Sequence, residues 1–238
     1  MLVRSLAITL AVAVSPVWSA AAERPDSRPQ YPDPFELYGP DIAFDVYRKG
    51  DKVGFHEVRF EQAGDSLRVV NTFQLEIEVL FFTAFRYRYH SDSRWRDGRL
   101  LQLTATVNDN GTKSVIQAAR DGAGMAIRTG EDRTAVDSIL FPTNHWNVAV
   151  LNQTRVLNTL TGRVNAVNIE RRGREEIATE RGPVMATRYA YTGEIDAEVW
   201  YDDQGRWVKL RFRGQDGSTV EYACRRCQGH VGAHAANG

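Results

Sequence analysis

Tight-turn signals recur along residues 42–224 and separate short runs in which apolar and polar side chains alternate. Glycine, asparagine and aspartate tolerate the positive φ angles that tight hairpins require. Alternation with a period of two is typical of a strand that buries one face. Together these signals predict an antiparallel meander. The turn signals are Lys49-Gly50-Asp51, Ala63-Gly64-Asp65, Asp97-Gly98, Asn110-Gly111, Asp121-Gly122, Arg172-Gly173, Arg181-Gly182-Pro183, Gln204-Gly205 and Asp216-Gly217.

The longest alternating run covers residues 67–82, with apolar side chains such as Phe73, Leu75 and Ile77 on one face. At about 3.3 Å per residue, a strand of this length would extend for roughly 50 Å, well above the usual length. We therefore expect it to bend, to bulge or to wrap around a curved sheet. The pair Thr83-Ala84 is expected to separate it from the next run, residues 85–95.

The alternating runs predict an all-β fold built from a single strongly curved antiparallel meander. We expect about twelve strands in a curved sheet or a barrel, because a flat open sheet of that size is disfavoured. One short helix is expected near residues 144–153, where Pro142 is followed by Thr143 or Asn144 as a candidate N-cap. This helix would plug one end of a barrel or cover the open side of a half-barrel.

Residues 1–22 have the pattern of a secretory signal peptide. Arg4 gives a positive start, residues 6–14 are apolar apart from Thr9, and small residues allow cleavage after Ala21 or Ala22. The apolar run is shorter than the roughly 20 residues of a membrane-spanning helix, although an uncleaved anchor is the alternative. No cysteine lies near the cleavage site, which argues against a lipoprotein anchor. The sequence predicts an exported protein that does not span the membrane, periplasmic in a Gram-negative host.

Three further segments follow the signal peptide. Residues 23–40 hold five of the eight prolines and predict an extended linker, whose end docks through Phe35, Leu37 and Tyr38. Residues 41–224 form the predicted β-barrel-like or half-barrel domain, and residues 225–238 are expected to be a flexible tail.

The charge balance excludes a strongly basic binding surface. Removal of residues 1–22 takes away Arg4 and leaves 29 Lys and Arg against 30 Asp and Glu. Such a balance gives no electrostatic basis for binding nucleic acid or an anionic membrane.

Several short segments resemble an uncharacterised family of exported bacterial proteins, described as a domain of unknown function. The resemblance covers nearly the whole chain after the signal peptide. It implies a β-rich periplasmic domain and brings no activity, cofactor or catalytic residue with it. The tail from Cys224 onward departs from the family pattern. The segments that carry the resemblance are Phe44-Asp45-Val46-Tyr47-Arg48 with Gly50 and Val53-Gly54, Phe85-Arg86-Tyr87-Arg88, Asn108-Asp109-Asn110-Gly111, Pro142-Thr143-Asn144-His145-Trp146-Asn147, Asn158-Thr159-Leu160-Thr161-Gly162 and Trp200-Tyr201-Asp202-Asp203-Gln204-Gly205-Arg206-Trp207.

The tail contains the one constellation with metal-ligand spacing. Cys224, Cys227, His230 and His234 are residue types that a tetrahedral zinc site takes. Export to an oxidising compartment favours a disulfide between the two cysteines instead. A redox-active pair is a third possibility, but the surrounding pattern is not that of a thioredoxin. A structural disulfide or a solvated tail is the favoured interpretation, with no metal and no cofactor.

Two other groups of residues are candidates for ligand binding. In one, Asn144, His145, Trp146 and Asn147 would hydrogen-bond and stack a polar ligand, although helix capping and anchoring explain the same residues. In the other, Arg86, Arg88 and His90 would form a cationic stripe on an inner face, although a solvated outer face is the default for such alternation.

No catalytic signature of a known enzyme class is present. Strongly curved sheets enclose either packed side chains or a ligand. An aromatic face therefore favours a non-enzymatic binding or cell-envelope module that holds a lipid or another amphiphile. Its expected members are Phe73, Phe81, Phe82, Phe85, Tyr87 and Tyr89. The alternatives are a structural or interaction protein without a small-molecule site, and an unrecognised hydrolase with a catalytic geometry at His145 or His90.

Overall fold

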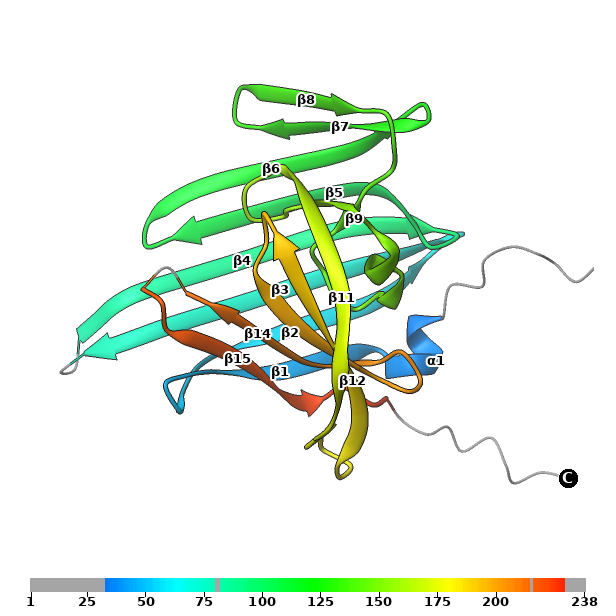
Figure 1. Ribbon diagram of the computed structural model, residues 1–238. Helices are drawn as coiled ribbons and strands as arrows, with labels where there is room; N and C mark the ends of the chain where they lie inside the picture. The colour runs from blue at the N-terminus through cyan, green and yellow to red at the C-terminus, as the bar shows by residue number, and fades with distance from the viewer. Residues whose placement is uncertain (1–32, 80–81, 215, 230–238) are drawn as a thin grey trace, which may run out of the picture. The chain divides into compact units, whose positions relative to one another are not determined.

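One fifteen-stranded sheet contains every strand of the computed structural model, which describes residues 33–79, 82–214 and 216–229 (Figure 1). The strands are β1 (Asp41–Arg48), β2 (Asp51–Ala63), β3 (Ser66–Val79), β4 (Phe82–Arg96), β5 (Arg99–Asp109), β6 (Thr112–Asp121), β7 (Gly124–Thr129), β8 (Asp132–Val136), β9 (Phe141–Pro142), β10 (Arg155–Leu157), β11 (Val164–Ile177), β12 (Val184–Gly193), β13 (Ala197–Asp202), β14 (Trp207–Arg213) and β15 (Thr219–Arg226). The predicted all-β class is confirmed. The strand count is fifteen, because the short β8 and β9 have no alternating pattern in the sequence.

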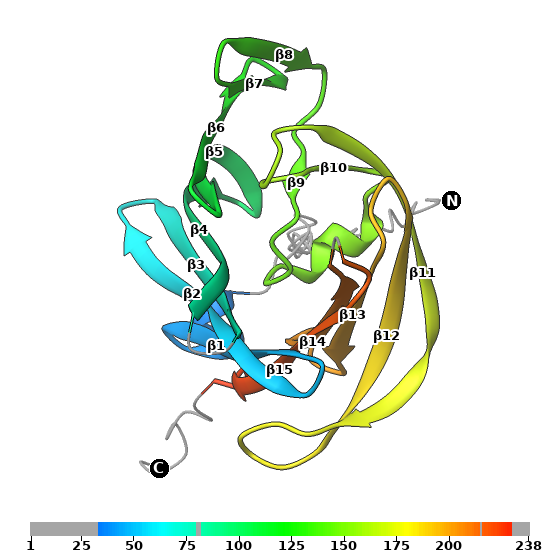
Figure 2. The ribbon, with the colours of Figure 1, turned by 90° about the vertical axis from the view of Figure 1, so that its left-hand side faces the viewer.

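Two meanders meet at the centre of the sheet. The strand order is β8-β7-β6-β5-β4-β3-β2-β1-β15-β14-β13-β12-β11-β10-β9, so the first and last strands are neighbours. All pairs are antiparallel except β9 and β10, which are parallel. The strands β8 and β9 are consecutive in the chain yet form the two edges of the sheet. The sheet is thus strongly curved but not closed (Figure 2). Of the two predicted alternatives, it is the curved sheet rather than the barrel.

The hairpins are built from the predicted turn residues. Asn110 and Gly111 both have positive φ, 48° and 100°, as a two-residue hairpin between twisted strands requires. The prediction of a turn at Arg172-Gly173 is wrong. Gly173 lies inside β11, where the pairing with β12 shifts register between Arg171 and Gly173. A glycine in a strand often marks such a bulge.

The long strands carry the expected irregularities. The β3–β4 register shifts between Ile77 and Glu78, near the end of the 14-residue strand β3. Thr83 and Ala84 do not interrupt the next strand, because β4 begins at Phe82 and runs for 15 residues.

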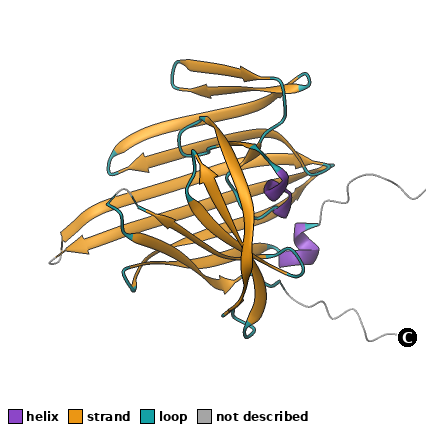
Figure 3. Ribbon diagram, viewed as in Figure 1, coloured by secondary structure: helices purple, strands orange, loops and turns teal. Residues whose placement is uncertain are grey.

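The helical segments differ from the expectation in position and type (Figure 3). The helix expected near residues 144–153 is a shorter 3-10 helix, η1 (Val148–Asn152), and its N-cap is Asn147 rather than Thr143 or Asn144. A second helix, α1 (Pro34–Tyr38), lies in the segment expected to be extended. Asp33 caps it by accepting the N–H of Phe35 at 2.9 Å, and proline at the first helical position loses no hydrogen bond.

Both ends of the described chain are packed against the sheet. Tyr38 stacks on Phe60, and Phe35 meets the same ring edge-on, so the predicted docking of these two residues is confirmed. At the other end, Cys227 and Gln228 are buried, which corrects the expectation of a flexible tail for this part. The predicted signal peptide, residues 23–32 of the linker and residues 230–238 lie outside the described residues.

The core is aromatic and joins the inner strand β4 to the edge strand β9 across the open side of the sheet. The Trp95 ring on β4 lies 5.9 Å from Phe141 on β9 and 5.1 Å from Trp146, centroid to centroid. Side-chain packing therefore joins the two meanders where strand pairing does not. The largest fully buried side chains are Trp95, Trp200, Trp207, Tyr38, Tyr191, Phe44, Ile42, Leu100, Leu103, Ile116, Met125 and Leu157.

Candidate functional site

A cavity of about 760 Å³ lies on the inner face of the curved sheet. Strands β2–β4 contribute one side and β14–β15 contribute another, and loop residues 143–145, 158–160 and 195–196 also line it. Strands from both meanders line one space, so this is the concave face. The apolar lining includes Phe73, Leu75, Ile77, Phe85, Tyr87, Leu160, Ile195, Leu210, Phe212 and Val220.

Strand pairing explains why the wall is apolar. Across the β3–β4 pair, Phe73 is opposite Tyr89, and Leu75 is opposite Tyr87. Directly opposite residues in an antiparallel pair point to the same face, so period-two alternation places these side chains together in the cavity. This is the aromatic face predicted for residues 73–89. Of its expected members, Phe81 and the side chain of Phe82 lie outside the described residues.

The floor of the cavity is polar and contains two histidines. His56 from β2 and His145 each lie against Trp207, with ring centroids 5.5 Å and 5.6 Å from the indole. Asn144 lines the same space and accepts a hydrogen bond from the Tyr89 hydroxyl at 3.4 Å. His56, His145 and Asn144 are all at least nine-tenths buried.

Burial keeps both imidazoles uncharged at neutral pH. Desolvation lowers the pKa of His56 to about 4, and the neighbouring Asn71 opposes this shift in part. Desolvation also lowers the pKa of His145 to about 3, and the nearby His56 lowers it further. A neutral imidazole offers one N–H donor and one nitrogen acceptor.

Charged residues line the cavity only at more exposed positions. Arg48 forms an ion pair with Asp216, and its Nε donates to the Ser218 hydroxyl at 2.8 Å. Hydrogen bonds from Ser218 and Arg48 hold the pKa of Asp216 well below its usual range. Together with the exposed Asp196 and Arg213, these side chains mark the mouth of the cavity.

The cationic stripe lies on the opposite face of β4 from the cavity. Arg86 and Arg88 are exposed and pair with Glu76, at 2.7 Å and 3.4 Å. His90 is also exposed, and its Nδ1 lies 3.4 Å from the Thr72 hydroxyl. The structure therefore separates these three candidates from the site, and it matches the solvated alternative.

The candidates in residues 144–147 divide into two roles. Asn144 and His145 line the cavity. Trp146 instead packs against Trp95 and Phe60, and Asn147 caps η1 by accepting the N–H of Ala149 at 3.0 Å. The anchoring and capping interpretation thus holds for Trp146 and Asn147.

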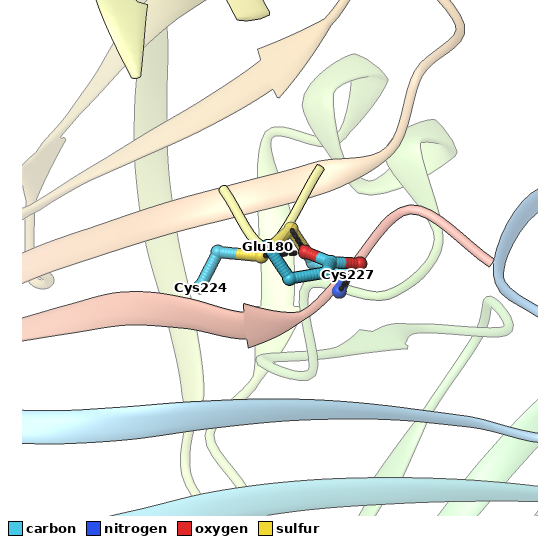
Figure 4. Close-up of side chains that lie close together, drawn as sticks. All are labelled: Glu180, Cys224 and Cys227. Atoms are coloured by element: carbon cyan, nitrogen blue, oxygen red, sulfur yellow. Dashed lines mark hydrogen bonds between the residues drawn. A yellow bond between two sulfur atoms is a disulfide. The ribbon is translucent and has the colours of Figure 1, made fainter. Parts of the chain in front are cut away.

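The two cysteines form a disulfide at the end of β15, one of the alternatives that the sequence left open (Figure 4). The carboxylate of Glu180, from the loop between β11 and β12, accepts the backbone N–H groups of Cys227 and Gln228 at 3.1 Å and 3.0 Å. A disulfide supplies no thiolate for zinc, and His230 and His234 lie outside the described residues.

Sequence reasoning missed His56 and Glu180. His56 precedes the inward-facing Val58 by two residues, so the alternation of β2 contained the signal. Glu180 has no comparable signal, because it meets Cys227 only through the folding of four strands.

The sequence of this chain matches one family model over most of its length. The model of a domain of unknown function, DUF6134, matches residues 44–225. The chain belongs to the DUF6134 family. The predicted resemblance to an uncharacterised domain family is thereby confirmed. No curated protein matches the sequence.

The DUF6134 fold is similar to a solved β-barrel-like structure. The crystal structure of a protein of domain of unknown function DUF1849 from Brucella abortus has a TM-score of 0.57 to this chain, at 8% sequence identity. The match covers 80% of this chain and 97% of the other. At this identity the similarity shows the fold alone.

Two observations concern the described part of the DUF6134 chain. Within the described residues, none of the helices is long and apolar enough to cross a membrane. In the same part of the chain, neither His145 nor His90 is hydrogen-bonded to a carboxylate.

Proposed function

We propose that this DUF6134 domain is an exported cell-envelope module that binds an apolar or amphiphilic molecule in the cavity. The observation that carries the proposal is the cavity itself. Its volume of about 760 Å³ falls within the range of about 300–1,000 Å³ for ligand pockets, and its walls are mainly apolar.

Three of the wall residues support an apolar tail in particular. Leu75, Ile77 and Phe85 leave apolar surface facing a space that no described side chain fills. An apolar ligand would gain about 25 cal/mol for each Å² that it removes from water. The mixed, near-neutral surface charge gives no reason to expect a nucleic acid as the ligand.

Export is supported by two independent features. The N-terminal pattern is that of a signal peptide, and the disulfide is of the kind that persists in oxidising compartments. Recovery of the protein in a periplasmic extract, with a mature N-terminus directly after Ala21 or Ala22, tests this part. An intact N-terminus in the cytoplasmic fraction would overturn it.

The binding proposal is tested with an uncharged apolar fluorophore, N-phenyl-1-naphthylamine. We expect saturable binding of one dye molecule to the mature protein. Leu75→Trp fills the cavity and should weaken binding at least tenfold. Gln74→Trp introduces the same side chain on the opposite face of β3 and should leave binding within twofold. Equal binding by both variants, or no binding by the wild type, would contradict the proposal.

A second measurement uses the protein from its native host. Organic extraction followed by mass spectrometry should recover an amphiphile in stoichiometric amount from the wild type and much less from Leu75→Trp. A structural protein without a small-molecule site would carry none.

A further inference from the structure

Four polar atoms on the cavity floor have no hydrogen-bond partner among the described residues. They are Nδ1 and Nε2 of His56, Nδ1 of His145 and Nδ2 of Asn144. The three residues are only 8%, 8% and 6% exposed, so bulk water does not solvate them freely. All three residues line the cavity, while the four atoms themselves have almost no solvent-exposed surface.

These unpaired buried atoms destabilise the folded protein unless a molecule in the cavity forms hydrogen bonds with them. An unpaired buried polar atom costs about 1–3 kcal/mol, and more than about nine-tenths of buried polar groups in native proteins are paired. Asn71, which neighbours His56, donates to the Ser91 hydroxyl at 3.3 Å and leaves its own Oδ1 unpaired. Five other buried polar atoms among the described residues also lack a partner, but none of their residues lines the cavity.

The depth of the wall residues indicates how a ligand would lie. Along β3 the side chains of Phe73 and Leu75 are buried and Ile77 is partly exposed; along β4 Tyr89 is buried and Phe85 is partly exposed. Exposure therefore increases from the histidines toward the mouth. A ligand that reaches the floor would place a polar group there and an apolar chain along these strands.

The charge of the floor limits the chemistry of that polar group. The imidazoles are neutral at pH 7, and the nearest charged lining residues belong to the more exposed mouth. Asn144 offers N–H donors, and each imidazole offers a donor or an acceptor. An anion at this depth would lose its hydration without meeting a cation, which is strongly unfavourable.

We infer that the His56–His145–Asn144 floor binds an uncharged head group that both donates and accepts hydrogen bonds, a hydroxyl in the simplest case. This inference rests on the proposed function and specifies which end of the amphiphile enters first. The ligand class is a long-chain alcohol or a lipid with a comparable neutral head, with its tail directed toward the mouth.

The test compares 1-decanol, undecane and decanoate as competitors of N-phenyl-1-naphthylamine at pH 7. The variant His56→Phe removes both a donor and an acceptor, and should weaken decanol at least tenfold while leaving undecane within twofold. His56→Gln restores both functions and should keep decanol within about threefold of the wild type. His90→Phe makes the same change on the outer face and serves as the matched control.

The outcomes separate this inference from the proposed function. If the wild type binds none of the dye, decanol and undecane, both the head-group inference and the proposed function are refuted. Equal effects of His56→Phe on decanol and undecane would refute the head-group site and leave cavity binding intact. Preferential loss of decanoate, with proton uptake when decanoate binds to the wild type, would also overturn the inference by indicating an anionic head. If His56→Phe does not fold, tighter wild-type binding of 1-decanol than of undecane supports the inference, and equal binding of the two refutes it.

Discussion

The Tyr38 hydroxyl donates a hydrogen bond to the backbone carbonyl of Trp146, 3.0 Å away and 108 residues later in the chain. The same hydroxyl accepts the backbone N–H of Trp207 at 2.9 Å. Helix α1 is thereby fastened both to the loop that carries His145 and to β14. One side chain near the start of the described residues thus holds two parts of the cavity floor in place.

Removal of this hydroxyl should destabilise the protein. In Tyr38→Phe the buried N–H of Trp207 loses its partner, and we expect the free energy of unfolding in urea to fall by about 1–3 kcal/mol. Tyr47→Phe, on a partly exposed tyrosine of β1, should change it by less than about 0.5 kcal/mol. Indistinguishable midpoints for the two variants would show that the Tyr38 bridge contributes nothing.

Acidification should weaken the fold before carboxylates begin to titrate. The unfolded chain protonates each histidine near pH 6.5, whereas the folded pKa values of His56 and His145 are about 4 and about 3. The unfolded state therefore binds more protons, and stability falls as the pH drops through 6.5. Between pH 7 and pH 5 the loss should be on the order of 2 kcal/mol for each imidazole.

The two histidines can be tested directly as the cause of this slope. The double variant His56→Phe/His145→Phe should have a flatter dependence of unfolding free energy on pH over this interval. His90→Phe, which changes an exposed histidine, should keep the wild-type slope. The prediction is wrong if the double variant and the wild type lose stability in parallel.

Close approach of two strands should make Gly54 irreplaceable. A Cβ at this position would lie 1.9 Å from the backbone oxygen of Gln74 on β3, so Gly54→Ala forces the strands apart. We expect a loss at the upper end of about 1–3 kcal/mol, measured by urea unfolding. A Cβ on Gly173 would meet no atom within 4 Å, and Gly173→Ala should change stability by less than about 0.5 kcal/mol. Equal stability of the two variants would argue against the steric explanation.

The Glu180 carboxylate should protect the end of β15. In Glu180→Ala the N–H groups of Cys227 and Gln228 lose their acceptor, so we expect both amides to exchange hydrogen faster, with about 1–3 kcal/mol less stability. Both N–H groups use the same oxygen, Oε1, so Glu180→Gln retains an acceptor there and should keep most of the protection. Unchanged exchange in Glu180→Ala would mean that the disulfide alone orders this segment.

The fold class was predictable because its signals are local. Turn pairs such as Asn110-Gly111 determine hairpins within a few residues, and alternation determines which side chains share a face. Strands β8 and β9 were missed because neither has an alternating apolar pattern. Helix α1 was missed because proline density suggested an extended chain, whereas Pro34 occupies the one helical position that tolerates proline.

The site was only partly predictable because it depends on contacts between distant segments. The aromatic face of residues 73–89 was evident, as was the presence of His145 in a loop. That His56 and His145 meet around Trp207 follows from pairing β1 with β15, a contact that no local pattern encodes. The sequence likewise placed Arg86 and Arg88 on one face of their strand. It did not show whether that face or the other would line a cavity.

The open sheet also has a consequence for how the molecule meets other chains. Its two ends present β8, which carries Asp132 and Arg133, and β9, which is two residues long and includes Pro142. Charges, brevity and proline each discourage the addition of a foreign strand. The sheet therefore stays open at its two edges, yet neither edge strand is a good template for fibril growth.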